Sequence, residues 1–172
     1  MMMIFHFDSL PISDNQLYGN IPGQARRFLS AKGKTYKQDV EAAVNEQIRH
    51  QDRTIGRKDT KYTDQILDLT DKELIVSIIL CGSWYTQSDS IRKKDCQNYS
   101  KALLDSIWTS FKLINPSLDD SQIWLLSIAK IDSEENGNKE YTEIQIKALY
   151  NEDDEDDGHD GQDEDNLKDI ED

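Results

Sequence analysis

The stretch Leu74-Ile75-Val76-Ser77-Ile78-Ile79-Leu80 (LIVSIIL) is a continuous apolar run made mainly of β-branched residues. Such a run is typical of a β-strand that is buried on both faces of a sheet. We therefore expect this strand inside a sheet, and we expect the segments on either side of it to form the remaining strands and the helices packed on them.

Periodicity defines the elements around this strand. Apolar residues recur at three- and four-residue steps on both sides of it, which indicates two amphipathic helices. In chain order, we predict a strand at Ile4–Phe7, a helix from about Lys34 to His50, the strand at Leu74–Leu80, a helix from Cys96 to Asn115, and strands at Ile123–Ile131 and Tyr141–Leu149. The polar segments between them are predicted as loops, with a short helical turn near Ile66. This β-α-β-α-β-β order predicts an α/β protein of the α+β type, with helices packed on one mixed sheet.

Negative charge is concentrated at the C-terminal end of the chain. Residues 151–172 carry 13 acidic side chains and one lysine, a net charge of −12, so residues 1–150 hold only −2 of the total −14. We therefore predict one domain over residues 1–150 and a disordered acidic tail over residues 151–172. Five tail residues also match the spacing of a calcium-binding loop, but helical flanks are missing and an acidic run produces such spacing by chance.

The cysteines and the N-terminal segment indicate the cellular compartment of the protein. Cys81 and Cys96 are too few for a disulfide framework and lack metal-type spacing. Free thiols are typical of a reducing cytoplasm. The first ten residues have no basic region, and His6 and Asp8 interrupt their apolar stretch, so we do not expect a secretory signal. No apolar run approaches the about 18 residues of a membrane span. We therefore predict a cytoplasmic protein with no membrane partner.

Candidate catalytic residues gather near the start of the second predicted helix. Asp95, Asn98 and Lys101 follow one another at three-residue spacing and share one side of a helix. Asp119 and Asp120 stand directly before the next strand, which would bring Asp120 back toward Asp95 if it docks beside that helix. Carboxylates with a nearby lysine suit Mg²⁺-dependent phosphodiester hydrolysis. An N-cap, an exposed helix lysine and an ordinary turn explain the same pattern.

Four segments, in chain order, resemble the RusA family of Holliday-junction resolvases. Asp95-Cys96-Gln97-Asn98-Tyr99-Ser100-Lys101-Ala102-Leu103-Leu104-Asp105 resembles the family's Asp-x-Asp-Asn-x-x-Lys-x-x-x-Asp segment. Leu118-Asp119-Asp120-Ser121-Gln122-Ile123 resembles its Asp-Asp-x-Gln-Val segment. Leu10–Asn15 resembles its Pro-x-Ser-x-Asn turn, and Ser30–Tyr36 its Ser-x-x-Gly-x-x-Tyr entry to the first helix. The likeness extends over about residues 4–148.

The resemblance implies a homodimeric endonuclease that depends on Mg²⁺, with Mn²⁺ as a substitute, and nicks four-way DNA junctions in recombination and repair. By position, Asp95 and Asp120 become metal-binding catalytic carboxylates, with Asp119 a weaker metal candidate. Lys101 becomes the cation on the phosphate side, and Asn98 orients the cluster. Gln97 stands where the family has a second carboxylate. An amide oxygen can bind Mg²⁺, but it brings no negative charge, so Gln97 puts metal affinity in doubt.

Basic and aromatic residues supply candidate DNA contacts. Cations near the metal site would contact phosphates and add affinity without reading sequence. The predicted contacts are Arg92, Lys93, Lys94, Arg26, Arg27 and Asn15. Arg53, Arg57 and Lys58 either extend this track or belong to a solvated loop. Tyr18, Trp84 and Tyr85 either contact exposed bases or pack in a core or interface.

Two other functions fit the same sequence. One is a relative that binds junctions but has lost turnover because Gln97 replaces a carboxylate. The other is an interaction module whose acidic tail mimics DNA and recruits a basic partner. Cleavage of a synthetic junction separates the enzyme from the binding protein.

Overall fold

The computed structural model describes residues 2–20, 27–56, 59–85 and 97–149. The predicted tail lies outside these ranges, and so do the site candidates Arg26, Arg57, Lys58, Arg92, Lys93, Lys94 and Asp95. For Asn15, Arg27, Gln97 and Asn98 only the course of the backbone is described.

The observed elements confirm the predicted fold class. In chain order they are β1 (Met2–Phe7), α1 (Asp14–Leu17), β2 (Tyr18–Asn20), β3 (Arg27–Leu29), α2 (Ala31–Thr54), α3 (Tyr62–Leu67), β4 (Leu74–Gly82), α4 (Gln97–Ile114), η1 (Asp120–Gln122), β5 (Ile123–Asp132), η2 (Ser133–Asn136) and β6 (Tyr141–Ala148). The long elements follow the predicted β-α-β-α-β-β order. The short pieces α1, β2 and β3 occupy a segment that was predicted as loop.

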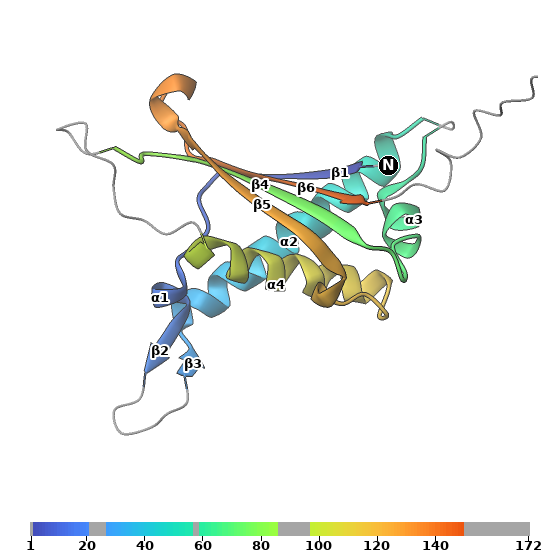
Figure 1. Ribbon diagram of the computed structural model, residues 1–172, viewed down its shortest axis with the longest axis horizontal. Coiled ribbons are helices and arrows are strands. Elements are labelled where there is room, and N and C mark those ends of the chain that lie inside the picture. Colours follow the sequence, from blue (N-terminus) through green and yellow to red (C-terminus); the bar gives the residue numbers. More distant parts are fainter. Residues whose placement is uncertain (1, 21–26, 57–58, 86–96, 150–172) are drawn as a thin grey trace, which may run out of the picture.

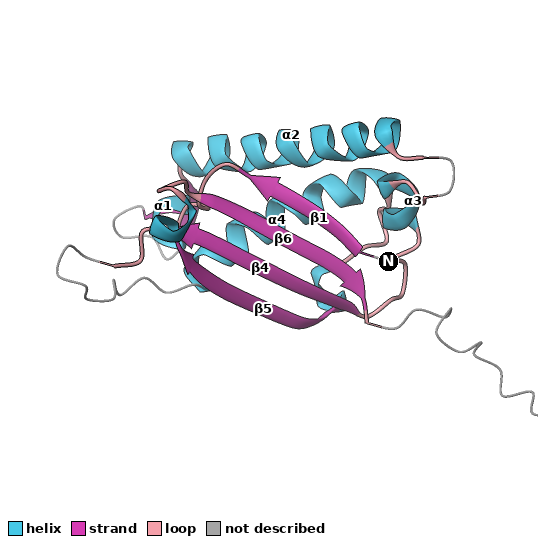
Figure 2. Cartoon of the chain, turned by 90° about the horizontal axis from the view of Figure 1, so that it is seen from above, coloured by secondary structure: helices cyan, strands magenta, loops and turns pink. Residues whose placement is uncertain are grey.

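Four strands form one mixed sheet in the order β1-β6-β4-β5. β4 and β5 are parallel and are connected through α4, whereas β6 runs antiparallel to both β1 and β4. Figure 1 shows α2 and α4 on the same side of this sheet, and Figure 2 shows the strands from the opposite side. Among the described elements, no helix is long and apolar enough to cross a membrane.

The burial of β4 corrects one expectation. Leu74, Val76, Ile78 and Leu80 are buried, but the residues between them are only half-buried as far as Ile79. The strand is therefore not buried on both faces, because α2 and α4 cover one face of the sheet only. The hydrophobic run of β4 reflects its central place between β6 and β5, where neighbouring strands shield the second face in part.

α2 begins earlier than its periodicity predicts because of a cap. The Ser30 side chain accepts a hydrogen bond from the Gly33 N–H at 2.9 Å, which satisfies one of the open donors of the first turn. The Ser30 N–H donates to the Leu17 carbonyl at 2.9 Å, which fastens α1 to the start of α2. A Cβ at Gly33 would lie 2.4 Å from that same carbonyl oxygen, so a larger residue would displace α1.

Candidate metal and phosphate site

An open polar pocket brings together two carboxylates of the sequence motifs. Asp105 of α4 and Asp120 of η1 both line it, and its volume is about 260 Å³. The remaining lining residues are Lys37, Leu104, Trp108, Thr109 and Lys112. Two carboxylates and two ammonium groups therefore surround one hollow between α2, α4 and the start of β5.

Asp105 lies between two lysines. Its carboxylate is 3.2 Å from the ammonium group of Lys37 on α2 and 3.8 Å from that of Lys101 one turn earlier on α4. The Asp105 and Lys37 side chains are about a quarter exposed, at 26% and 23%, so solvent screens this pair less than a surface pair. Asp105 thus holds the position of both cations.

The Asp119 side chain caps the N-terminus of η1. Its carboxylate accepts the Ser121 N–H at 3.0 Å, and the Gln122 side chain accepts the Asp119 N–H at 2.9 Å, which completes a capping box around η1. The backbone hydrogen bond from Ser121, its side-chain hydrogen bond and nearby Lys112 lower the pKa of Asp119 to about 2. Asp119 therefore remains ionised at any pH near neutrality.

Asp120 differs from its neighbour. Among the residues that the structure describes, its exposed carboxylate has no hydrogen-bond or ion-pair partner. A free carboxylate at the wall of a polar pocket is open to a cation. The geometry therefore favours Asp120 over Asp119 as a metal ligand.

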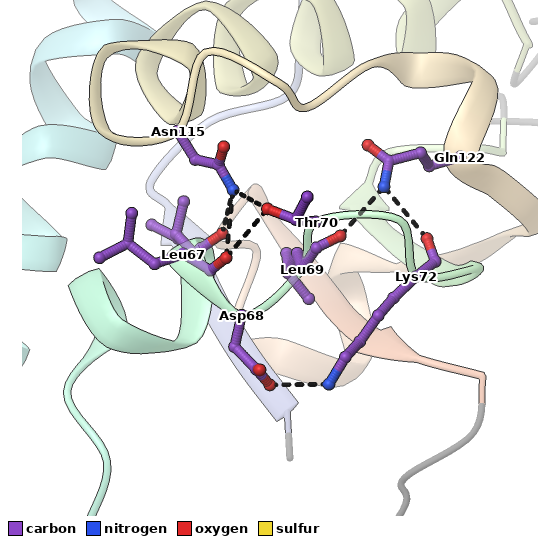
Figure 3. A network of polar contacts seen from close by, with 8 residues as sticks. Leu67, Asp68, Leu69, Thr70, Lys72, Asn115 and Gln122 are labelled. Atoms are coloured by element: carbon purple, nitrogen blue, oxygen red, sulfur yellow. Dashed lines mark hydrogen bonds and ion pairs between the residues drawn. The ribbon is translucent and has the colours of Figure 1, made fainter.

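Two amide side chains, of buried Asn115 and half-buried Gln122, hold the segment that carries Asp120 (Figure 3). The Asn115 amide donates to the carbonyls of Ile66 and Leu67 at 3.1 and 3.2 Å, and to the Thr70 hydroxyl at 2.9 Å. The Gln122 amide donates to two further carbonyls of the same loop, those of Leu69 and Lys72, at 3.0 and 3.2 Å. The α4–β5 connection is thereby tied to the α3–β4 connection, which fixes η1 beside α4.

The position of β5 sets where Asp120 meets the helix. β5 begins opposite Leu74, so Asp120 lies beside the part of α4 that carries Asp105, Thr109 and Lys112. Eight residues separate Gln97 from Asp105, a rise of about 12 Å along a helix. Lys101 does not line the pocket and reaches it through Asp105. Asp95 lies outside the described residues, so its approach to Asp120 stays a prediction.

The donor set fits Mg²⁺ in part. Within the described ranges, no three His, Cys, Asp or Glu side chains gather as a metal-binding group. Mg²⁺, however, is commonly held by one or two carboxylates, with water and phosphate oxygens completing its shell. Asp120 offers such a carboxylate, and Asp105 offers a second at the same pocket.

Comparison with known proteins adds only distant structural likeness. No protein-family model matches the chain, and no curated protein matches it. The crystal structure of the periplasmic domain of Helicobacter pylori MotB is similar over 88% of this chain and 90% of that chain, at 10% identity and a TM-score of 0.29. A likeness of this size carries no argument about fold or function.

The structure also places the remaining candidates. Trp84 is buried, and its indole N–H donates to the carbonyls of Leu80 and Ile131 at 3.2 and 2.8 Å, so it packs in the core rather than meeting bases. Tyr85 is exposed, and Arg53 lies in the last turn of α2. Tyr18 belongs to the short hairpin strand β2.

Sequence reasoning missed three residues of the pocket. Asp105 belongs to the Asp95–Asp105 segment, but the resemblance assigned it no function. Its four-residue spacing from Lys101 is that of a helical ion pair. Lys37 and Lys112 carry no local signal, because only the packing of α2 on α4 and the return of the chain at η1 bring them to the pocket.

The indole N–H of Trp108, which is buried, has no acceptor among the described residues.

Proposed function

We propose that this protein is a metal-dependent endodeoxyribonuclease that resolves four-way DNA junctions by paired phosphodiester hydrolysis, acting in the cytoplasm in recombination and repair. One observation carries the proposal beyond the RusA resemblance. Asp105 and Asp120, which come from two separate motifs, line one pocket together with Lys37 and Lys112. Carboxylates and ammonium groups around one open hollow are the residue types that phosphodiester hydrolysis requires.

Each residue of the pocket has a distinct task in this proposal. Mg²⁺, when bound, would neutralise phosphate charge and make a water nucleophilic at neutral pH. Asp120 would hold the ion, with Asp95 from the resemblance as the second catalytic carboxylate and Asn98 orienting them. Lys37 and Lys112 stand at the pocket to bind phosphate oxygens. Asp105 keeps Lys37 and Lys101 in place.

Cleavage of a synthetic four-way junction tests the proposal. With Mg²⁺ or Mn²⁺, we expect paired nicks at symmetric positions in opposite strands, and little cleavage of a linear duplex with the same arm sequences. Binding is measured in parallel by gel shift without metal. A protein that binds the junction but never nicks it would replace the enzyme with the binding-only function, and equal cutting of both substrates would remove junction specificity.

Lys101→Ala should slow junction cleavage by about 10²–10³-fold, the loss expected when a cation that stabilises developing charge is removed. Lys101 is exposed and pairs with Asp105, so the substitution leaves the core untouched. Single-turnover rates at saturating Mg²⁺ measure the loss. Lys139→Ala, which removes an exposed lysine between η2 and β6, is the matched control and should cleave normally. A normal rate in Lys101→Ala would return Lys101 to the role of a surface residue.

Gln97→Asp tests the departure from the family pattern. A restored carboxylate should strengthen Mg²⁺ binding, so half-maximal cleavage should need about tenfold less Mg²⁺, which corresponds to about 1.4 kcal/mol of binding free energy. Titration of the cleavage rate with Mg²⁺ checks this, and Gln97→Ala should shift the curve the other way. Identical Mg²⁺ curves for all three proteins would place Gln97 outside the metal shell.

A further inference from the structure

Helical side chains fasten β1, the edge strand of the sheet, to the helices beside it (Figure 2). The Gln47 side chain of α2 accepts the His6 N–H at 2.9 Å and donates to the His6 carbonyl at 2.7 Å. The Tyr62 hydroxyl of α3 accepts the Ile4 N–H at 3.0 Å and donates to the Ile4 carbonyl at 3.3 Å. These contacts close the edge to another strand. They also hold the last residues of β1 against α2.

A pocket of about 350 Å³ opens between the end of β1 and α2. Its apolar wall consists of Phe7, Val40, Ala43 and Leu103, with the ring of Tyr36 beside them. Small-molecule sites usually have volumes of about 300–1,000 Å³ and combine apolar and aromatic walls with a few polar groups. This pocket has that size and that lining. It shares no lining residue with the proposed catalytic pocket.

The charge of this second pocket is negative. Asp8, Asp39 and Glu46 line it, and no lysine or arginine is among the described residues that do. The His6 ring, 3.9 Å from the Asp8 carboxylate, is the one basic group of the lining. Asp39 and Glu46 have no hydrogen-bond or ion-pair partner within the described ranges. A positively charged ligand would therefore meet carboxylates that the protein itself leaves unpaired.

Tyr36 adds a second open group to the pocket. Its hydroxyl has no hydrogen-bond partner in the part of the chain that the structure describes. Burial raises the pKa of Tyr36, so the hydroxyl stays protonated and can donate a hydrogen bond. The face of an aromatic ring also attracts a cation. Tyr36 therefore favours the same kind of ligand as the carboxylates do.

The spacing of the carboxylates selects an elongated cation. Asp39 and Glu46 are seven residues apart on α2, which is nearly two turns and a rise of about 10.5 Å. Across the described ranges, no three His, Cys, Asp or Glu side chains gather as a metal-binding group, so these charges do not converge on one point. A metal ion or a single lysine side chain would reach only one end of the pocket. An extended spermidine chain, with nine single bonds of about 1.5 Å, spans roughly 11 Å.

We propose that this pocket binds a linear aliphatic polyamine. Its alkyl chain would lie on the apolar wall, and its terminal ammonium groups would lie at Asp39 and Glu46. Asp8 supplies a third negative charge, which matches the three positive charges of a triamine such as spermidine. The inference concerns ligand binding, and it holds or fails independently of nuclease activity.

Titration of the full chain with spermidine, followed by two-dimensional NMR of its backbone amides, tests the proposal. The acidic segment 151–172 attracts any cation, so the measurement must be local to the pocket, and salt of about 0.15 M screens that attraction. We expect saturable shifts at Ala43 and Thr142, which both line the pocket, with a dissociation constant below about 1 mM. Putrescine, which is shorter and has two ammonium groups, should bind about tenfold more weakly.

Charge-removing variants test the two ends of the pocket. Asp39→Asn and Glu46→Gln should each raise the spermidine dissociation constant by about fivefold, the effect of one ion pair near the surface. Both side chains are exposed, so these substitutions leave the core untouched. Glu41→Gln is the matched control, because Glu41 is on the same helix but does not line the pocket. It should bind spermidine as the wild-type protein does.

Ala43→Leu tests the pocket without a change of charge. The larger side chain fills space along the apolar wall, and leucine is a good helix former, so α2 should persist. Spermidine should bind at least about tenfold more weakly, and circular dichroism verifies the fold. Three results would each overturn the proposal. They are the absence of saturable shifts below about 1 mM, unchanged affinity in Ala43→Leu, and a loss in Glu41→Gln equal to that in Asp39→Asn.

Discussion

Asp120→Asn should reduce nicking of a four-way junction by about 10³-fold or more, while junction binding stays the same or becomes tighter. The Asp120 carboxylate lines the pocket without a partner among the described residues, so the structure gives it no other task. The amide has the same size but lacks the charge that a metal ion requires. Loss of that charge also removes repulsion toward phosphate, so the affinity for the junction need not fall. Single-turnover cleavage and gel-shift binding measure the two effects separately, and Asp95→Asn should behave in the same way.

Asp119→Asn is the matched control for this prediction. Asparagine is as good an N-cap as aspartate, so the capping box around η1 should survive. Cleavage should therefore remain within about tenfold of the wild-type rate, a change of 1.4 kcal/mol in the barrier. Near-normal cleavage by Asp120→Asn would show that the metal-site assignment is wrong. If Asp119→Asn lowered the cleavage rate as much as Asp120→Asn does, both aspartates would have to be assigned as metal ligands.

Asn115→Ala should lower the free energy of unfolding by about 3 kcal/mol, because the buried Ile66 carbonyl loses its side-chain donor, at a cost of about 1–3 kcal/mol, and the hydrogen bonds to the Leu67 carbonyl and the Thr70 hydroxyl are lost as well, at about 1 kcal/mol each. The Leu67 carbonyl keeps the Thr70 hydroxyl as a donor at 3.1 Å, and Asn115 itself is 4% exposed. For a chain of 172 residues, we expect the melting temperature to fall by about 6–12 °C. Urea denaturation and thermal melts followed by circular dichroism measure both quantities.

Ser117→Ala separates this loss from a general effect of the loop. The Ser117 hydroxyl donates to the Asn115 side-chain oxygen at 2.7 Å, but Ser117 is exposed, so water can replace the bond. Its loss should cost about 1 kcal/mol or less. Because the Asn115 amide also ties down the segment that carries Asp120, Asn115→Ala should cleave more slowly even at temperatures far below its melting transition. Unchanged stability in Asn115→Ala would contradict this account of the loop.

The long elements were predictable because their patterns are long. α4 shows its apolar face over five turns, and the β-branched run of β4 identified the central strand. The short pieces α1, β2 and β3 were not, because three or four residues are too few for a period to appear. The start of α2 depends on the cap at Ser30, which carries no apolar signal.

The site was predictable only as a set of motifs. Spacing predicts Lys101 and Asp120 as candidates, but their relation in space depends on contacts between distant segments. Asn115 was interpreted only as the end of a helix, yet its amide sets the path from α4 to β5. Lys37 approaches Asp105 across 68 residues of sequence, and no local pattern encodes that approach. The polar contacts that fix a pocket therefore lie beyond periodicity and spacing.

The closed edge of β1 has a consequence for solubility. A sheet that grows by edge pairing can form an open-ended fibre only if both of its edges accept a strand. Here the Tyr62 hydroxyl and the Gln47 amide already occupy the outward groups of Ile4 and His6. At these two residues, a further strand therefore finds no open backbone partner along β1. Two polar side chains thus protect this edge of the sheet from pairing with another strand, and loss of Gln47 would open the outward groups of His6.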